Sequence, residues 1–197
     1  MVAVVLASGF SKRMGRPKAL LPWKNGVLLE HTLQQLIETG VKRVYYVYQD
    51  PAIEKQMASS GLACVSIFNP EAHQGKSASI AAAIDFLESE GVDYEAVLFA
   101  VCDQPLLDHH DYIALLELFQ NSNSSVAAAA YAGTFGVPMV VERAALSEIH
   151  KLSGDQGMKE IVRRSALTVA QLDVQEKGAD VDDPKTYQSL YAQFGKE

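Results

Sequence analysis

Cysteine and positive charge are both scarce in this sequence of 197 residues. The two cysteines, Cys64 and Cys102, stand far apart in apolar runs and lack the paired spacing of a zinc site or a redox pair, so we expect two buried thiols. Lys and Arg number 17 against 24 Asp and Glu, which gives a formal net charge of -7. The chain as a whole does not complement a nucleic-acid backbone or an anionic membrane, so any phosphate must be met locally by a few cations, backbone amides and a metal.

Long apolar runs are absent as well, since none approaches the roughly 20 residues of a membrane-spanning helix. The N-terminal residues 1–6 lack the basic start and cleavage site of a signal peptide. We therefore expect a cytoplasmic protein that binds neither a membrane nor a nucleic acid. The length, the 48% apolar composition and the lack of any linker or repeat predict a single domain over residues 1–197.

What the sequence does contain is an alternation of short β-branched runs with longer segments of helical period. This alternation is typical of an α/β fold, here three α/β/α layers around a mainly parallel, Rossmann-like sheet. The expected strands are 2–6, 43–48, 63–68, 96–101 and 126–130. The expected helices are 28–39, 53–60, 78–90, 111–120, 143–151, 158–164 and 184–194. Residues 133–136 are expected to form a turn before an apolar stretch at 137–141.

The first loop after a predicted strand, Ala7–Lys18, holds two glycines, three small residues and four cations within 12 positions. Glycine lets a backbone approach a phosphate closely, and exposed amides with nearby Arg and Lys offset its charge. The alternative is an ordinary turn with solvated basic residues, but so many cations in an acidic chain favour triphosphate binding. The loop matches neither the P-loop nor the G-x-G-x-x-G pattern, which argues against a P-loop kinase and a dinucleotide dehydrogenase.

Carboxylates follow the fourth predicted strand and precede the last predicted helix. Asp103 lies just beyond an apolar strand, where a divalent ion that bridges phosphate oxygens is the usual reason for a carboxylate; capping of the next turn is the alternative. Asp180 and Asp182 alternate along an extended segment and so face the same side, while Asp183 is placed to cap the helix. Either of the alternating pair could complete a metal site if the segment returns to the fourth strand; otherwise it is a solvated acidic loop.

The connection Asn69–Ser79 joins a strand to a helix and carries hydroxyls near the helix start. Its amides and hydroxyls could hold a base or a ribose, although helix capping by Ser77 and Ser79 is a sufficient explanation. The histidines show no site pattern: His31 and His150 lie on the surfaces of predicted helices. We therefore assign no histidine a catalytic or ligand role.

Residues 6–22 read Leu-Ala-Ser-Gly-x-Ser-x-Arg-Met-Gly-x-x-Lys-x-Leu-Leu-Pro, which resembles the opening signature of the molybdenum cofactor nucleotidyltransferases, the MobA-like NTP transferases. Further family motifs follow in the same order: Asn69-Pro70 with Gly75 and Ser79, Asp103-Gln-Pro105, Gly136-x-Pro138, Gly154-Asp-Gln-Gly157 and Asp180-Val-Asp182-x-Pro184. The resemblance implies the architecture of the nucleotide-diphospho-sugar transferases, which is glycosyltransferase A-like.

Within this family the sequence is most similar to the molybdenum cofactor cytidylyltransferases. These enzymes use CTP and Mg²⁺ to convert molybdenum-molybdopterin to its cytosine dinucleotide form and release diphosphate. The guanylyltransferase branch usually opens Leu-Ala-Gly-Gly and has an Asp before the lysine, whereas this chain has Ala7-Ser8-Gly9 and Pro17-Lys18, so we expect CTP rather than GTP. Val137 departs from the family, which often has histidine in its Gly-His-Pro motif.

The resemblance implies a role for each matching position. Lys18, Arg13 and Asp103 would be catalytic, and Asp103 and Asp182 would hold Mg²⁺, with Asp182 preferred to Asp180. The implied nucleotide-binding residues are Leu6, Ala7, Ser8, Gly9, Arg13, Lys18, Asn69, Pro70, Gly75, Ser79 and Asp103. The implied acceptor-binding residues are Gly136, Pro138, Gly154, Asp155, Gln156 and Gly157.

Other functions stay open on the sequence alone. The chain could be a guanylyltransferase, or a nucleotidyltransferase of the same fold that acts on a sugar phosphate. It could also be an accessory protein that carries a cofactor without catalysis. In the cytidylyltransferase interpretation the partners are CTP and a molybdopterin acceptor, and a molybdenum hydroxylase would receive the product.

Overall fold

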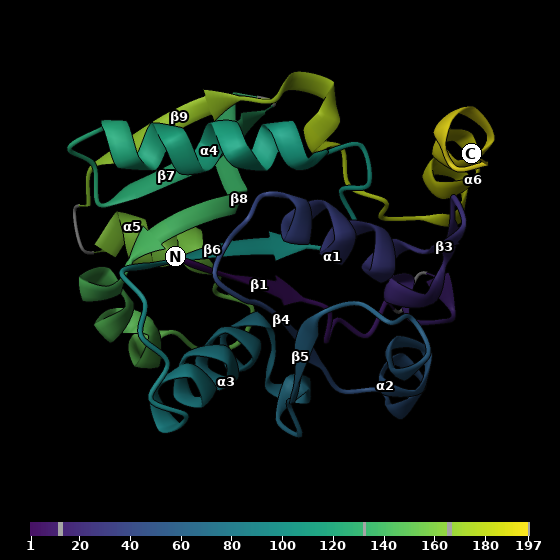
Figure 1. Ribbon diagram of the computed structural model, residues 1–197, viewed down its shortest axis with the longest axis horizontal. Helices are drawn as coiled ribbons and strands as arrows, with labels where there is room; N and C mark the ends of the chain where they lie inside the picture. The colour runs from purple at the N-terminus through teal and green to yellow at the C-terminus, as the bar shows by residue number, and fades with distance from the viewer. Residues whose placement is uncertain (12–13, 132, 165–166, 197) are drawn as a thin grey trace.

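The computed structural model of the protein describes residues 1–11, 14–131, 133–164 and 167–196. Its centre is a seven-stranded sheet of order β5-β4-β1-β6-β8-β7-β9, in which β8 alone runs antiparallel to its neighbours (Figure 1). The strands are β1 Val2–Leu6, β4 Val44–Tyr48, β5 Cys64–Phe68, β6 Ala96–Val101, β7 Val126–Tyr131, β8 Thr134–Glu142 and β9 Val169–Asp173. This mainly parallel sheet confirms the predicted fold class.

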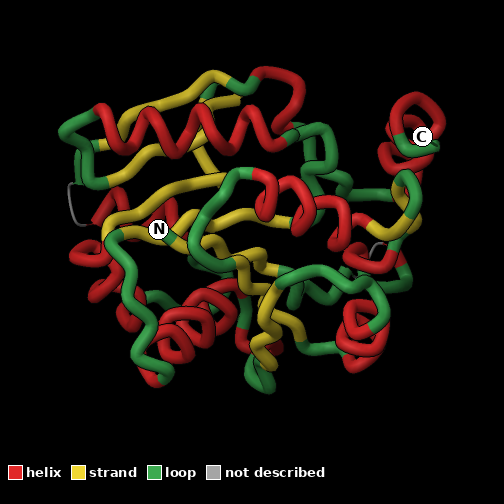
Figure 2. The backbone as a smooth tube through the Cα atoms, viewed as in Figure 1, coloured by secondary structure: helices red, strands yellow, loops and turns green. Residues whose placement is uncertain are grey.

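Helices cover both faces of the sheet, as Figure 2 shows in red. The helices are α1 Leu28–Glu38, α2 Pro51–Ala58, α3 Lys76–Ser89, α4 His109–Asn121, α5 Met158–Arg164 and α6 Pro184–Phe194, and the longest 3-10 helix is η4 Arg143–Lys151. Buried side chains of α1, α2 and α4 pack in one cluster, and those of α3, η4 and α5 pack in a second cluster on the opposite face. Among the described residues, no helix is long and apolar enough to cross a membrane.

The central strands are buried on both faces because their side chains alternate between the two clusters. In β6, Leu98 belongs to the first cluster and Val97 and Phe99 belong to the second, and all three are fully buried. In β1, Ala3 belongs to the first cluster and Val4 belongs to the second. A strand that must satisfy two apolar layers reads as an uninterrupted apolar run, which is why these strands could be located from sequence.

Parallel pairing brings the carboxyl ends of the central strands to one edge. Leu6 at the end of β1 pairs with Val47 of β4 and with Val101 of β6. The loops that start at Ala7 and at Cys102 therefore leave the sheet side by side. This register determines where the site described below lies, because ligands of open α/β sheets bind beyond the carboxyl ends of the strands.

Several local predictions were wrong or missing. Residues 134–136 belong to β8 rather than to a turn, since the hairpin with β7 is tight and Gly133 lies in the left-handed region at φ 72°. The helical segment predicted at 143–151 is confirmed with the same bounds, as the 3-10 helix Arg143–Lys151; the helical period alone does not distinguish this type from an α-helix. The edge strand β9 and the small hairpin of β2 (Pro22–Trp23) with β3 (Gly26–Val27) were not predicted. Both cysteines are free, but Cys64 is only half-buried.

A small third core joins the C-terminal helix to the rest of the molecule. Leu21, Trp23, Leu28 and Val181 are buried together, and α6 packs its half-buried Tyr187 against them. In Figure 1, α6 accordingly lies beside β3, far along the sequence from it. This packing brings the acidic segment that precedes α6 back toward the sheet, and Asp183 caps α6 as predicted.

We predict that Phe99→Ala lowers the free energy of unfolding by about 3–5 kcal/mol, because the substitution leaves a cavity between fully buried strands and helices. Phe194→Ala is the control, since this side chain is 44% exposed and its loss should cost no more than about 0.5 kcal/mol. Urea unfolding followed by circular dichroism measures both. Equal losses would contradict the assignment of Phe99 to the core.

Candidate active site

Three segments that are distant in sequence meet at the carboxyl edge of the sheet. The Nζ atom of Lys18 donates hydrogen bonds to Asp103 Oδ2 at 2.9 Å and to Asp182 Oδ1 at 2.7 Å. The Lys18 side chain is 14% exposed, while those of Asp103 and Asp182 are 24% and 48% exposed. The ammonium group is thus largely enclosed, and the two carboxylates that accept from it remain accessible from solvent.

Backbone contacts fix the position of each member of this triad. The backbone N–H of Lys18 donates to Ser11 Oγ at 3.0 Å, where a short 3-10 helix begins. Asp103 lies two residues beyond the end of β6, and its carbonyl oxygen accepts from the N–H of Val181 at 2.7 Å. The acidic segment before α6 therefore does return to the fourth strand of the predicted series, which was the condition for a shared carboxylate site.

The electrostatics of the cluster favour a bound cation. Burial lowers the pKa of Lys18, but the carboxylates of Asp103 and Asp182 outweigh it, so that the pKa lies above its ordinary value. Desolvation and the neighbouring charge of Asp103 raise the pKa of Asp180 to about 6. Crowded carboxylates repel one another, and a cation placed among them relieves this repulsion.

A cavity of about 590 Å³ opens over the triad. Its charged lining consists of Lys18, Lys76, Asp103, Asp180 and Asp182. Lysines and carboxylates line the same cavity, so that an anionic ligand could reach both the lysines and a metal held by the carboxylates.

The donor set at this cavity fits a divalent cation that a substrate helps to bind. Within the described ranges, no group of three or more His, Cys, Asp or Glu side chains is arranged to hold a metal. Asp103 and Asp182 nevertheless converge on a single cation, the Lys18 ammonium. Because Mg²⁺ is usually bound by one or two carboxylates together with substrate phosphates and water, two converging carboxylates are sufficient.

A second cavity, of about 360 Å³, adjoins the first and is largely apolar. The two cavities share Gly9, Lys76, Val101 and Val137 in their linings. The apolar lining of the second cavity includes Leu6, Ile80, Met139 and Met158. An apolar cavity beside a charged one suits a ligand with a flat heterocycle at one end and phosphates at the other.

Two buried serines in the wall of this apolar cavity form a network with the buried Asn69 behind them. Ser8 Oγ lies 2.5 Å from Ser79 Oγ, which also accepts from Asn69 Nδ2 at 3.2 Å. The cap of α3 is Gly75, without a side-chain hydrogen bond, so helix capping does not account for Ser79. The hydroxyl of Ser77 also has another partner, the carbonyl oxygen of Gly154 at 2.9 Å.

The residues predicted to bind the acceptor lie in two places. Gly154 packs against Gly75, where an added Cβ would collide with the Gly154 carbonyl, and Asp155 and Gly157 line the apolar cavity. Gln156 instead accepts a hydrogen bond from the backbone of Ser153. Gly136 and Pro138 lie on β8 on either side of Val137, which is one of the residues that border both cavities. The segment 154–157 thus sits next to the loop predicted to hold the base.

Not every predicted residue is placed in the cavities. Arg13 lies outside the described residues, and Pro70 is exposed and lines neither cavity. Sequence reasoning missed Lys76, which lines both cavities, although a lysine directly after a glycine at a helix start was a usable signal. It also missed Tyr131 in the charged cavity, for which no local pattern gave a signal.

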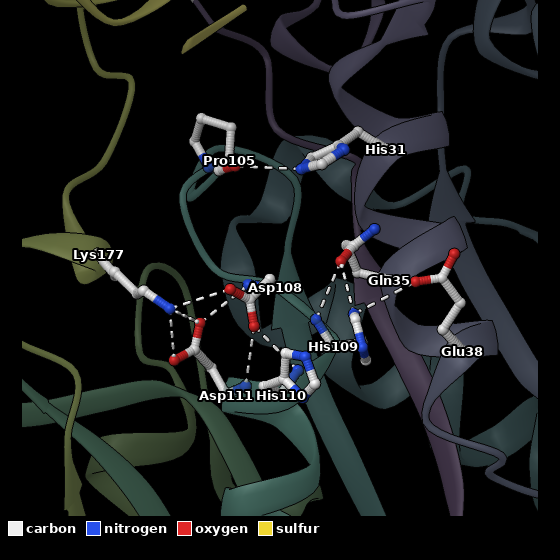
Figure 3. A network of polar contacts seen from close by, with 9 residues as sticks. All are labelled: His31, Gln35, Glu38, Pro105, Asp108, His109, His110, Asp111 and Lys177. Carbon is white, nitrogen blue, oxygen red and sulfur yellow. Dashed lines mark hydrogen bonds and ion pairs between the residues drawn. The ribbon is translucent and has the colours of Figure 1, made fainter. Parts of the chain in front are cut away.

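Polar contacts hold the loop that follows Asp103, as Figure 3 shows. His31 Nε2 donates to the carbonyl oxygen of Pro105 at 3.1 Å, so this histidine links α1 to the loop instead of only facing solvent. Lys177 Nζ donates to Asp108 at 3.0 Å and to Asp111 at 2.9 Å at the start of α4. Among the described residues, no histidine lines either cavity.

Sequence comparisons point to one family. Residues 3–171 match the model of the MobA-like NTP transferase domain. The purine catabolism protein PucB of Bacillus subtilis (strain 168) is 26% identical over 204 residues, which cover 95% of this chain and 94% of that protein. A probable molybdenum cofactor guanylyltransferase of Bacillus anthracis (strain CDC 684 / NRRL 3495) is 28% identical over 123 residues. That match covers 62% of this chain and 58% of the relative, little more than half of its length.

Solved structures share the fold over almost the whole chain. Rv0371c from Mycobacterium tuberculosis H37Rv superposes with a TM-score of 0.80 at 25% identity over 98% of both chains. A structure of Rv0371c in complex with manganese superposes with a TM-score of 0.73 at 23% identity over 96% of both chains. CMP:2-keto-3-deoxy-manno-octonic acid synthetase complexed with CTP gives 0.78 at 15% identity over 98% of this chain and 97% of that one. The last two likenesses show a common fold.

We predict that protonation of His31 destabilises the folded protein. Burial lowers the pKa of His31 below its ordinary value, so the unfolded chain takes up this proton at a higher pH than the folded chain. The free energy of unfolding should therefore fall as the pH decreases from about 6.5 toward the lowered pKa of the folded state. His31→Gln, which keeps a donor for Pro105, should reduce this dependence in urea unfolding at a series of pH values. An unchanged dependence would contradict the prediction.

Proposed function

The chain belongs to the MobA-like NTP transferase family, and from that membership we propose that it transfers CMP from CTP to the terminal phosphate of molybdenum-molybdopterin. The products are molybdopterin cytosine dinucleotide and diphosphate. One observation carries the proposal: the Lys18 ammonium lies between Asp103 and Asp182 in a charged cavity, next to an apolar cavity with buried hydroxyls. The chain is a nucleotidyltransferase, and such enzymes of this family use divalent metal ions.

The two cavities suggest how CTP lies in the site. The triphosphate occupies the charged cavity, because Lys18 and Lys76 reach it there together with the carboxylates. The cytosine occupies the apolar cavity, bounded by the backbone of residues 6–9 and by the buried hydroxyls of Ser8 and Ser79. A ligand of this shape spans both cavities across Gly9, which they share. Glycine at that point leaves the backbone open to close approach.

The reaction needs no protein base. The terminal phosphate of the pterin is already ionised at neutral pH and attacks the α-phosphorus of CTP in line with the departing diphosphate. Catalysis therefore reduces to positioning and to neutralisation of charge. Lys18 stabilises the charge that develops on the α-phosphate, and we assign Arg13 to the diphosphate.

A divalent ion fits this chemistry. We propose that it is Mg²⁺ and that Asp103 and Asp182 hold it, since these two carboxylates already converge on one cation. When bound, such an ion neutralises phosphate oxygens and polarises the phosphoryl group. Manganese in the related Rv0371c structure supports the choice of a divalent ion.

CTP is preferred to GTP because of the side chain at position 8. Ser8 is buried in the wall of the apolar cavity and hydrogen-bonded to Ser79, so it takes up room that the glycine of the guanylyltransferase signature leaves open. A smaller pyrimidine suits the reduced space. The CTP-bound synthetase of the same fold supports this preference, whereas the guanylyltransferase relatives favour GTP over the part of the chain that they match.

The acceptor is assigned by family motifs, of which the one at 136–138 borders the charged cavity through Val137 and the one at 154–157 borders the apolar cavity. Val137 stands at the junction of both cavities between Gly136 and Pro138, so an acceptor that enters from β8 would meet the α-phosphate there. The product would then pass to a molybdenum hydroxylase. A nucleotidyltransferase for sugar phosphates of the same fold is the second candidate, supported by the fold it shares with the sugar-acid synthetase.

We predict CTP-dependent release of diphosphate in the presence of Mg²⁺ and molybdenum-molybdopterin, with at least about tenfold slower release from GTP, because the buried Ser8 hydroxyl narrows the base cavity. Asp103→Asn should reduce turnover at least about 100-fold, since it removes a charge that faces the phosphates. Asp93→Asn is the matched control, because this carboxylate is 92% exposed and far from the cavities. Enzyme-coupled diphosphate detection measures all three proteins.

The other outcomes assign the other functions. Release with GTP alone would make the chain a guanylyltransferase. Release with a sugar phosphate and with no molybdopterin species would assign the second candidate. Binding of CTP without diphosphate release, with acceptor and Mg²⁺ present, would favour a carrier.

A further inference from the structure

The aromatic residue at the end of β7 touches the segment that carries the second carboxylate. Tyr131 lines the charged cavity, and its hydroxyl donates to the carbonyl oxygen of Val137 at 3.1 Å. One side of its ring lies against Gly178, where an added Cβ would stand 2.7 Å from Cδ1 and 2.9 Å from Cγ. The hydroxyl end lies against Gly136, where an added Cβ would stand 2.5 Å from the Tyr131 oxygen.

At both positions glycine is required because there is no space for a side chain, and not because of the backbone conformation. Neither Gly136 nor Gly178 has a positive φ, so their backbones would accept any residue. The Tyr131 side chain excludes a side chain at both positions: its hydroxyl does so at Gly136 and its ring carbons do so at Gly178. The ring is thus wedged between β8 and the residue that opens the acidic segment 178–182.

The acidic segment is attached on both sides of this wedge. Gln104 Nε2 donates to the Gly178 carbonyl oxygen at 3.3 Å, which is a long hydrogen bond. Further along, the N–H of Val181 donates to the Asp103 carbonyl oxygen at 2.7 Å. The Tyr131 ring lies directly against Gly178, so it fixes where the segment begins, ahead of the bond at Val181.

We infer that Tyr131 is a positioning residue for the metal site: its ring holds residues 178–182 so that the Asp182 carboxylate stays within reach of Asp103. The inference rests on the proposed metal site but goes beyond it, because it assigns a role to a residue that contacts neither the metal nor the nucleotide base. Side chains that orient metal ligands typically change metal affinity about 10- to 100-fold when removed.

The test is Mn²⁺ binding, followed by the electron paramagnetic resonance signal of free Mn²⁺ in the presence of CTP. Tyr131→Ala removes the wedge and should weaken Mn²⁺ affinity about tenfold or more. Tyr131→Phe keeps the ring and loses only the bond to Val137, so its affinity should stay within about threefold of wild type. Circular dichroism establishes that each variant is folded.

A rescue experiment keeps the inference testable if Tyr131→Ala fails to fold. Gly136→Ala should displace the ring and weaken Mn²⁺ binding, and Tyr131→Phe in the same chain should restore it, because the colliding atom at 2.5 Å is the hydroxyl oxygen. Gly178→Ala should weaken binding in the same way but should not be rescued by Tyr131→Phe, since its added Cβ meets the ring carbons.

The controls separate this inference from the proposed function. If Asp103→Asn leaves Mn²⁺ affinity unchanged, the metal site is wrong and the role of Tyr131 falls with it. If Asp103→Asn weakens Mn²⁺ binding but Gly136→Ala and Gly178→Ala do not, the metal site stands and the positioning role is wrong. Rescue of both glycine variants by Tyr131→Phe would also contradict the inference, because it would mean that the ring contact at Gly178 does not affect Mn²⁺ binding.

Discussion

One ammonium group between two carboxylates is the interaction on which the candidate site depends. Lys18 comes from the first loop, Asp103 from the end of β6, and Asp182 from the segment before α6, so the pairing closes the chain over 164 positions. A partly buried ion pair of this kind contributes little net stability, because desolvation of the charges offsets their attraction. Its value lies in placement: it keeps a cation and two anions at the edge where the nucleotide phosphates would arrive.

The fold makes this convergence possible through strand register and through the packing of the C-terminal helix. Because β1 pairs in parallel with both β4 and β6, the loops after these strands leave the sheet at the same edge. The acidic segment reaches that edge through packing of α6 on the hairpin of β2 and β3, and through the backbone bond between Val181 and Asp103. The carboxylates of Asp103, Asp180 and Asp182 then line one cavity together with Lys18, while the cavity beside it has a mainly apolar lining.

Much of this arrangement could be predicted from sequence, and the reasons are local. Strands buried on both faces read as apolar runs, and Asp103 stands out because it follows such a run at once. The capping role of Asp183 also follows from residue type and position, because Asp before Pro at a helix start is a strong signal. The motif resemblance added the choice of Lys18 and Asp182, which spacing alone left open.

What could not be predicted depends on contacts between distant segments. The edge strand β9 lacks a clear pattern because it is half-exposed, and β8 begins earlier than expected because its hairpin is tight. Tyr131 has no local pattern, since its importance comes from Gly136 and Gly178, which lie elsewhere in the chain. From sequence alone, His31 has the pattern of a surface residue, because its hydrogen-bond partner Pro105 lies in a loop that is distant along the chain.

The most direct test is a crystal structure of the protein with Mn²⁺ and a non-hydrolysable CTP analogue, with the metal located by its anomalous scattering. We predict one metal peak in contact with Asp103 and Asp182, the α-phosphate within hydrogen-bond reach of Lys18, and the cytosine beside Ser8. A metal peak away from both carboxylates, or a base outside the apolar cavity, would contradict the central claim that these three segments form the nucleotidyl-transfer site.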